Sequence, residues 1–187
     1  MRIGGGRFRG RTLKAPSTHD VRPTSDRLRE AVFNILTHTY DDVCAGARVI
    51  DLFAGTGALG LEALSRGARF ALFVDDSAEG RALVRGNVEQ LGVGGETRIF
   101  RRDATKLGPM PAQEPFTLAF LDPPYGRDLA PLALASLRDG GWLADDALCI
   151  VEESRDAALE PVGGFTLLER RDYSETQVAF LRRAAGA

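Results

Sequence analysis

The sequence predicts an α/β fold of the Rossmann-like kind, built on a mostly parallel sheet, and three observations support this prediction. From residue 48 onward, apolar runs of strand length alternate with stretches whose apolar residues recur at helical spacing. A glycine-rich segment, residues 55–60, directly follows one apolar run, as at the turn from a parallel strand into a helix. Near the end of the chain, only a short polar segment separates two apolar runs, which predicts an antiparallel hairpin.

The first expected element is an amphipathic helix that begins near residue 25. Thr24 or Ser25 can cap its first turn with a side-chain oxygen. Its apolar residues then follow the i, i+3, i+4, i+7, i+8 spacing of one helical face: Leu28, Ala31, Val32, Ile35 and Leu36.

Seven strands are expected beyond this helix, and together they form one sheet. The first five are expected at 49–53, 70–74, 97–100, 116–121 and 147–151, with helices at 59–66, 79–91 and 129–137. The last two, 165–168 and 177–181, flank a turn-like segment at 172–175. They close the mostly parallel sheet as an antiparallel hairpin.

Length and composition indicate one globular domain with a basic appendage. The chain has 187 residues, of which 44% are hydrophobic and 27% charged, as in ordinary globular proteins. The formal net charge of −2 is unevenly spread: residues 1–30 carry eight Lys or Arg against three Asp or Glu, so the rest of the chain is acidic. We therefore expect a basic N-terminal arm and linker at 1–24 and the main domain at 25–187.

Membrane and metal-binding classes are disfavoured. No apolar run reaches the roughly 18 residues that cross a bilayer, and the chain does not begin with the apolar stretch of a secretion signal. Cys44 and Cys149 match no zinc spacing, and only His19 and His38 could supplement them. We expect a cytoplasmic, monomeric protein without a metal.

The glycine-rich segment predicts a nucleotide cofactor site. Gly55, Gly57 and Gly60 form a Gly-x-Gly-x-x-Gly pattern, in which the backbone can approach a cofactor closely. Asp75 lies 20 positions after Gly55, where an acid typically accepts from ribose hydroxyls. The pattern also fits a plain strand-to-helix turn, and a dinucleotide as well as S-adenosylmethionine.

Two further carboxylates bear on the choice of cofactor. Asp51 lies in the strand just before the glycines, where it suits a cationic sulfonium or ammonium and would repel pyrophosphate. It can also simply anchor the loop through backbone amides. Asp103, followed by Ala104, comes after strand 97–100 and can accept from an adenine amino group or lie in solvent.

A tetrapeptide after strand 116–121 predicts a substrate site at the same sheet edge. It reads Asp122-Pro123-Pro124-Tyr125. The prolines offer no backbone donor, so the carbonyl at Asp122 or Pro123 can accept from a ligand, and the ring of Tyr125 can stack on a flat base. A planar base with an exocyclic NH2 fits, provided that it is single-stranded, looped out or flipped. A plain turn after the strand is the alternative.

Methyl transfer to that amino group is the chemistry that these residues suit. The transfer is an in-line displacement that depends mainly on positioning. Acceptors at Asp122 and Pro123 would bond both N–H hydrogens and stabilise the positive charge that develops on nitrogen. Whether Asp122 also acts as a general base stays open.

Three further stretches recur together in a known family. They are 2–5 with 9–11, the segment 22–30 leading to 33–34, and the run 51–67, Asp-Leu-Phe-Ala-Gly-Thr-Gly-Ala-Leu-Gly-Leu-Glu-Ala-Leu-Ser-Arg-Gly. Over almost its whole length the chain resembles the bacterial 16S ribosomal RNA guanine-N2 methyltransferases of the RsmD type. It departs from them at Ser174, where many members carry glycine after the tyrosine, and at Ser77, where an acid is common.

The resemblance implies a seven-stranded, S-adenosylmethionine-dependent methyltransferase fold with a short basic N-terminal extension. It implies methylation of a guanine N2 in 16S rRNA, in an assembled or nearly assembled small subunit. Guanine would be held by Asp122, Pro123, Pro124 and Tyr125. The cofactor would be held by Asp51, Phe53, Ala54, Gly55, Gly57, Leu59, Gly60, Asp75, Asp103 and Ala104. RNA phosphates would be bound by Arg7, Arg9, Arg11, Arg22, Thr24 and Arg27.

Three other functions compete with this one. The same fold could methylate adenine or cytosine in DNA or a glutamine of a protein, but such enzymes often have Asn at the position of Asp122, and the basic arm favours nucleic acid. The chain also lacks a separate DNA-recognition domain. An NAD-dependent oxidoreductase would leave residues 122–125 unexplained. An RNA-binding module without catalysis is disfavoured because every expected catalytic position is filled.

Overall fold

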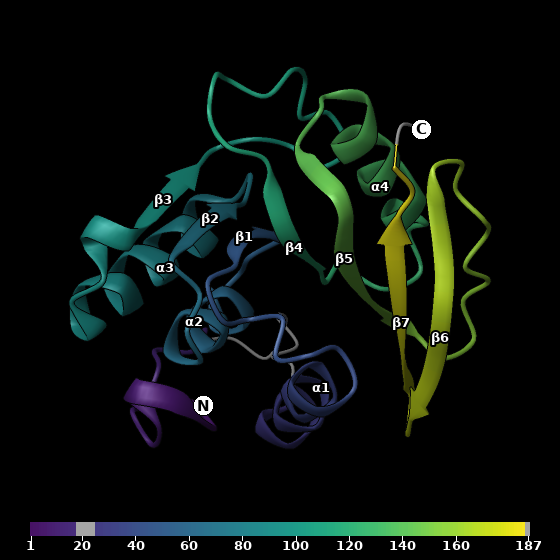
Figure 1. Cartoon of the computed structure of the whole chain (residues 1–187). Helices are drawn as coiled ribbons and strands as arrows, with labels where there is room; N and C mark the ends of the chain where they lie inside the picture. The colour runs from purple at the N-terminus through teal and green to yellow at the C-terminus, as the bar shows by residue number, and fades with distance from the viewer. Residues whose placement is uncertain (18–24, 186–187) are drawn as a thin grey trace.

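A seven-stranded sheet with helices on both faces forms the body of the protein (Figure 1). The computed structural model describes residues 1–17 and 25–185. The strands are β1 (Arg48–Leu52), β2 (Phe70–Val74), β3 (Thr97–Phe100), β4 (Phe116–Leu121), β5 (Leu143–Ser154), β6 (Phe165–Tyr173) and β7 (Thr176–Arg183). Their order is β3-β2-β1-β4-β5-β7-β6. Strands β1 to β5 are all parallel to one another. Strand β7 is antiparallel to its neighbours β5 and β6, which confirms the predicted sheet.

The helices follow the predicted order, and their ends lie within one or two residues of the predicted ones. They are α1 (Asp26–His38), α2 (Ala58–Ser65), α3 (Ala78–Leu91) and α4 (Leu129–Asp139), with short 3-10 turns η1 (Gly6–Phe8) and η2 (Gly94–Glu96). Ser25 caps α1, since its hydroxyl accepts from the backbone N–H of Leu28 at 3.1 Å. Thr24, the other predicted cap, lies outside the described residues.

Three strands are longer than predicted. The sequence indicated 147–151, 165–168 and 177–181, whereas β5, β6 and β7 run over Leu143–Ser154, Phe165–Tyr173 and Thr176–Arg183. The polar C-terminal residues of β5, 152–154, and of β6, 169–173, pair with β7. The backbone ladder, rather than side-chain hydrophobicity, therefore holds these ends in the sheet.

The sheet divides the core in two. Alternate residues of a strand face opposite sides, so Val49 of β1 belongs to one buried cluster and Ile50 to the other. The first cluster contains Leu61 of α2 and Val84 of α3, together with residues of α1. The second contains Leu134 of α4. Helices α1, α2 and α3 thus cover one face and α4 the other.

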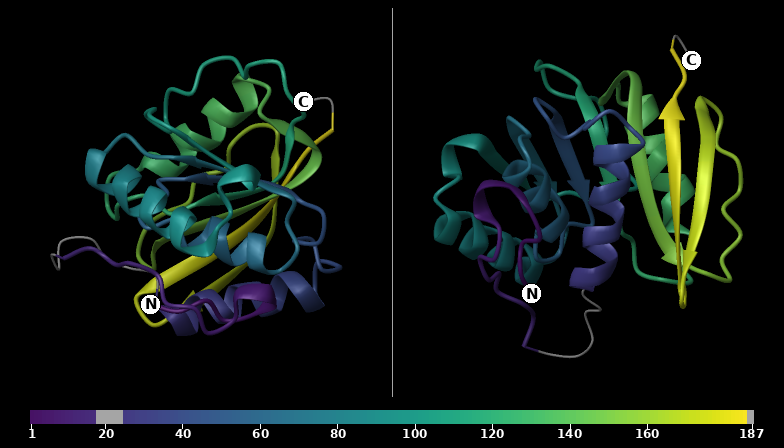
Figure 2. Two further views of the ribbon diagram at one scale, coloured as in Figure 1. Left: turned by 90° about the vertical axis from the view of Figure 1, so that its left-hand side faces the viewer. Right: turned by 60° about the horizontal axis from the view of Figure 1, so that its bottom comes forward.

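The start of the chain packs against the body (Figure 2). Ile3 and Leu13 are each only 2% exposed and belong to the first core cluster. An antiparallel bridge between Arg2 and Thr12 closes the intervening residues into a loop. The division of the chain after residue 24 stays a prediction. Within the described ranges, every helix is too short or too polar to span a bilayer.

Candidate cofactor and substrate site

The glycine loop connects β1 to α2 at the carboxyl edge of the sheet. Gly57 adopts a left-handed φ of 79° and caps α2, a conformation that suits glycine. Gly60 lies in the first turn of α2, where a Cβ would come within 2.5 Å of the Phe73 ring. Glycine at position 60 therefore allows helix α2 to pack closely on β2.

Three side chains hold this loop by its backbone. The Asp51 Oδ2 atom accepts from Gly60 N at 3.0 Å, and the Asp75 Oδ2 atom accepts from Gly55 N at 2.9 Å. From α3, Asn87 Nδ2 donates to the Thr56 carbonyl at 2.9 Å. The predicted anchoring bond from Asp51 is present, and the loop is fixed from β1, from the end of β2 and from α3.

The buried position of Asp51 disfavours its charged form. Its side chain is almost without solvent exposure. Burial, together with the nearby charge of Asp75, raises the pKa of Asp51 to about 8, and the hydrogen bond from Gly60 opposes this rise. A cation in the pocket would favour the ionised carboxylate instead.

Asp75 is held in place by Ser77, the residue that departs from the family pattern. Ser77 donates to the Asp75 Oδ1 atom from its backbone N at 2.9 Å and from its hydroxyl at 2.7 Å. The same hydroxyl accepts from Gly80 N at 3.0 Å and caps α3. Serine therefore orients the carboxylate without adding a charge.

Asp103 follows β3 and is exposed. Its Oδ1 atom accepts from the Thr105 hydroxyl at 2.7 Å and from the Thr105 backbone N–H at 2.9 Å. These two bonds hold the pKa of Asp103 below its ordinary value, against slight burial. The carboxylate is therefore ionised and fixed in direction.

The tetrapeptide after β4 lies at the same edge as the glycine loop. Pro123 is buried, Asp122 and Tyr125 are half-buried, and Pro124 is exposed. The Tyr125 hydroxyl lies 2.6 Å from the Thr176 hydroxyl at the start of β7. The aromatic ring is therefore tied to the antiparallel end of the sheet.

One cavity of about 520 Å³ brings most of the predicted residues together. Its volume lies within the usual range for small-molecule sites. The predicted residues that line it are Asp51, Phe53, Ala54, Gly55, Leu59, Asp75, Asp103, Ala104, Asp122, Pro123, Pro124 and Tyr125. Gly57 and Gly60 do not line it, because they face Phe73 in the core.

The charge of the cavity lining is strongly one-sided. Arg102 is its single basic residue, and that guanidinium donates to the Leu107 carbonyl at 2.8 Å and lies over the Phe100 and Trp142 rings. The lining carries six carboxyl groups: Asp51, Asp75, Asp76, Glu79, Asp103 and Asp122. Such a pocket suits a cationic ligand and repels a pyrophosphate.

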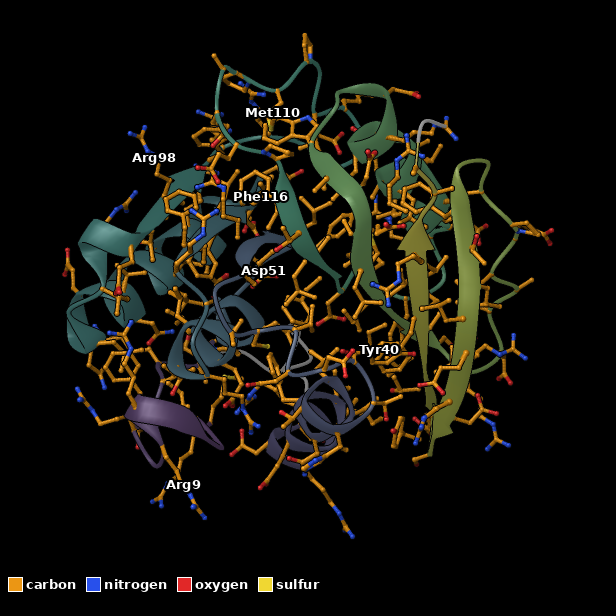
Figure 3. All side chains as sticks on the ribbon, viewed as in Figure 1. Arg9, Tyr40, Asp51, Arg98, Met110 and Phe116 are labelled. Atoms are coloured by element: carbon orange, nitrogen blue, oxygen red, sulfur yellow. The ribbon has the colours of Figure 1, made fainter. Side chains whose placement is uncertain are left out.

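The described members of the predicted RNA-binding set lie outside this cavity. Arg7 forms an ion pair with Glu96 at 2.9 Å, and Arg11 donates to the Gln90 carbonyl at 3.0 Å. Arg9 points away from the body (Figure 3), and Arg27 is exposed on α1. Two further predicted residues, Arg22 and Thr24, lie outside the described part of the chain.

The sequence reasoning missed several residues of the site. Met1 and Arg102 line the cavity, Thr176 holds Tyr125, and Asn87 holds the glycine loop. One of them carried a signal: Asn87 lies on the apolar face of its helix, beside Val88 and close to other core positions. A polar residue on such a face is hydrogen-bonded when buried.

The strand order, with its antiparallel β7 and a ligand-sized cavity at the glycine loop, defines a Rossmann-like methyltransferase of the S-adenosylmethionine-dependent fold. The family model described as "Conserved hypothetical protein 95" matches residues 1–182. The chain belongs to this family, which is the RsmD type of rRNA methyltransferase.

Relatives of known name agree with this assignment. Ribosomal RNA small subunit methyltransferase D of Escherichia coli (strain K12) is 39% identical over 96% of this chain and 87% of its own length. The protein of the same name from Haemophilus influenzae is 32% identical over 91% of this chain and 88% of its own. A solved structure titled "Putative methyltransferase yhhF from Escherichia coli" is 34% identical, with a TM-score of 0.84 over 99% of this chain and 98% of that one.

Proposed function

We propose that this protein transfers a methyl group from S-adenosylmethionine to the exocyclic N2 of a guanine in 16S rRNA of the small ribosomal subunit. The single observation that supports it best is the cavity that joins the glycine loop to the tetrapeptide 122–125, with six carboxyl groups against one guanidinium. When bound, S-adenosylmethionine supplies an electrophilic methyl group on a cationic sulfur. The names of the relatives favour small-subunit rRNA as the acceptor.

The carboxylates around the glycine loop fit this cofactor. Asp75, fixed by Ser77, would accept from ribose hydroxyls, and Asp103 would accept from the adenine amino group. Asp51 is buried beside the cavity, so its ionised form is favourable only when a cationic ligand lies next to it. In this role it would face the positive charge of the cofactor.

The tetrapeptide would bind the guanine. Asp122 and the Pro123 carbonyl would accept from the two N–H bonds of the amino group, and the ring of Tyr125 would stack on the base. The incoming methyl replaces one amino hydrogen, which leaves as a proton. Acceptors already in place stabilise the positive charge that develops on nitrogen before that proton departs.

The lining charges also weigh against the competing cofactor. NAD carries a pyrophosphate, which would meet the carboxyl groups of the cavity with Arg102 as its only basic partner there. An acceptor in DNA or protein needs the same pocket chemistry, so only the test below separates these acceptors from rRNA.

The first prediction concerns Asp122. Asp122→Ala should keep the wild-type affinity for S-adenosylmethionine and lower the rate of methyl transfer by about 10²- to 10³-fold, as when one preorganised polar partner is lost. The measurement is transfer of tritiated methyl to small subunits that lack the modification, with mass analysis of the nucleosides for N2-methylguanosine.

Asp145→Ala is the matched control, because Asp145 is an exposed aspartate on β5 that does not line the cavity. It should transfer methyl at the wild-type rate. Unchanged turnover in Asp122→Ala would remove the proposed substrate site. Incorporation into DNA, protein or large-subunit RNA would overturn the acceptor.

A further inference from the structure

The first fourteen residues, here called the N-terminal segment, contact the glycine loop directly at one end and through the Asn87 side chain at the other. The Met1 side chain lines the cavity, and its Sδ atom lies 3.6 Å from the Thr56 hydroxyl. At the other end, Lys14 N donates to Asn87 Oδ1 at 2.7 Å. The Nδ2 atom of Asn87 donates to the Lys14 carbonyl at 3.2 Å and to the Thr56 carbonyl at 2.9 Å. One fully buried amide thus joins the segment to the loop.

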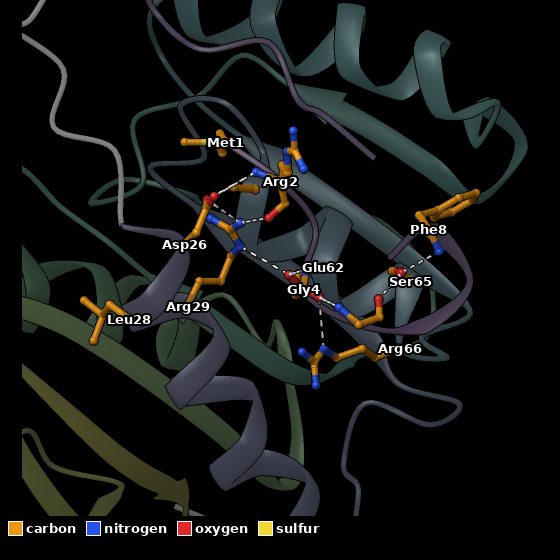
Figure 4. Close-up of polar contacts among 12 residues, drawn as sticks. Met1, Arg2, Gly4, Phe8, Asp26, Leu28, Arg29, Glu62, Ser65 and Arg66 are labelled. Atoms are coloured by element: carbon orange, nitrogen blue, oxygen red, sulfur yellow. Dashed lines mark hydrogen bonds and ion pairs between the residues drawn. The ribbon is translucent and has the colours of Figure 1, made fainter. Parts of the chain in front are cut away.

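The middle of the segment is seated on α2, the helix that the glycine loop opens (Figure 4). Glu62, which is fully buried, accepts from Gly4 N at 2.8 Å and from Gly5 N at 3.1 Å. Ser65 accepts from Phe8 N at 2.9 Å and donates to the Gly5 carbonyl at 2.5 Å. Bonds from backbone N–H groups to a buried carboxylate are strong and directional. The segment therefore has one defined position on the helix.

We propose that the N-terminal segment is a structural wall of the cofactor site, and that Asn87 is the positioning residue that couples its seating to the glycine loop. The proposal rests on the proposed function, because it takes S-adenosylmethionine as the ligand. Asp51 and Asp75 hold the loop by its N–H groups, whereas Asn87 holds it by a carbonyl. An amide is required at this position because it must accept from one N–H and donate to two carbonyls.

A substitution at Gly6, in the middle of the segment, can test whether the seating of the segment affects the cofactor site. Gly6 has a left-handed φ of 76°, and a Cβ at this position would lie 1.8 Å from the Ser65 carbonyl oxygen. Gly6→Ala therefore cannot keep the segment seated. Gly46 has a similar φ of 72° outside the segment, with nothing within 4 Å of its added Cβ. Gly46→Ala carries the same backbone strain without the collision and is the matched control.

The experiment measures the dissociation constant for S-adenosylmethionine by calorimetry on the full chain, with the melting temperature of each variant. Asn87→Ala and Gly6→Ala should each weaken binding about tenfold, which corresponds to about 1.4 kcal/mol and to one lost buried hydrogen bond. Asn87→Asp, which can accept but not donate, should behave like Asn87→Ala. In turnover assays, KM for the cofactor should rise while kcat at saturating cofactor changes little.

A double-variant cycle separates coupling from general damage. The dissociation constant of the double variant should increase by less than the product of the two single-variant increases, because Asn87→Ala and Gly6→Ala both break the same connection. Should Gly6→Ala fail to fold, Ser65→Ala replaces it, since it removes two bonds to the segment and adds no atom.

Three results would overturn the proposal in distinguishable ways. Lower melting temperatures with wild-type dissociation constants would make the segment a packing element only. If the increases in dissociation constant for Asn87→Ala and Gly6→Ala simply multiply in the double variant, Asn87 and the segment act on cofactor binding independently. A wild-type protein that does not bind S-adenosylmethionine would instead defeat the proposed function.

Discussion

Asp51 is a carboxyl group with almost no solvent exposure at the edge of a cavity. Its pKa of about 8 in the folded protein lies above the value of about 3.9 for an exposed aspartate. Between these values the folded protein holds a proton that the unfolded chain has lost. The free energy of unfolding without ligand should therefore fall as the pH rises through this window, and level off above it.

The second prediction follows from that linkage. Affinity for S-adenosylmethionine should rise between about pH 6 and about pH 9, because the carboxylate that would face the proposed cationic ligand ionises over this range. Asn at this position can still accept from Gly60, so Asp51→Asn should fold and should lack the Asp51 part of the rise. Calorimetry at several pH values checks this. Identical pH profiles for both proteins would contradict it.

At the scale of elements, the turn between β6 and β7 carries a strained residue. Ser174 has a φ of 54°, the left-handed region that costs a non-glycine residue about 1–2 kcal/mol. The hairpin matters for the site because Thr176, at the start of β7, contacts the Tyr125 hydroxyl.

The third prediction is that Ser174→Gly stabilises the protein. Glycine relieves the strain but is more flexible in the unfolded chain, so the net gain should be about 0.5–1 kcal/mol, or a rise of about 1–4 °C in melting temperature. Glu175→Gly is the control: its φ is not positive, so the same change should destabilise. Thermal unfolding of both variants decides, and a lower melting temperature for Ser174→Gly would contradict the strain argument.

Elements differ in how far the sequence reveals them. Strands β2 and β4 match their predicted ranges because each is a short, mainly apolar run between clear breaks. Strand β3 also matches, although half of its residues are polar. The polar C-terminal ends of β5 and β6 are held by pairing with β7, which no local pattern encodes. Likewise Asn87 joins residues 14 and 56, so its role depends on contacts that are distant in sequence.

At the scale of the whole molecule, positive and negative charge serve different parts of the proposed reaction. The cavity lining is acidic, and the formal net charge of the chain is −2. RNA therefore needs a local basic surface. Residues 1–30 carry eight Lys or Arg, but Arg29 is buried and adds nothing to such a surface. Because Arg7 and Arg11 already bond to Glu96 and Gln90, the exposed Arg9 and Arg27 are the better candidates for phosphate contacts.

The last prediction tests this surface. Arg9→Glu and Arg27→Glu should each weaken binding to small subunits and lower the slope of log affinity against log salt by about 1, the change expected for one lost phosphate contact. Affinity for S-adenosylmethionine should stay unchanged. Arg98→Glu, an equally exposed arginine on β3 and remote from Arg9 in Figure 3, should bind subunits like the wild type. Equal losses in all three variants would mean that net charge, not this surface, governs RNA binding.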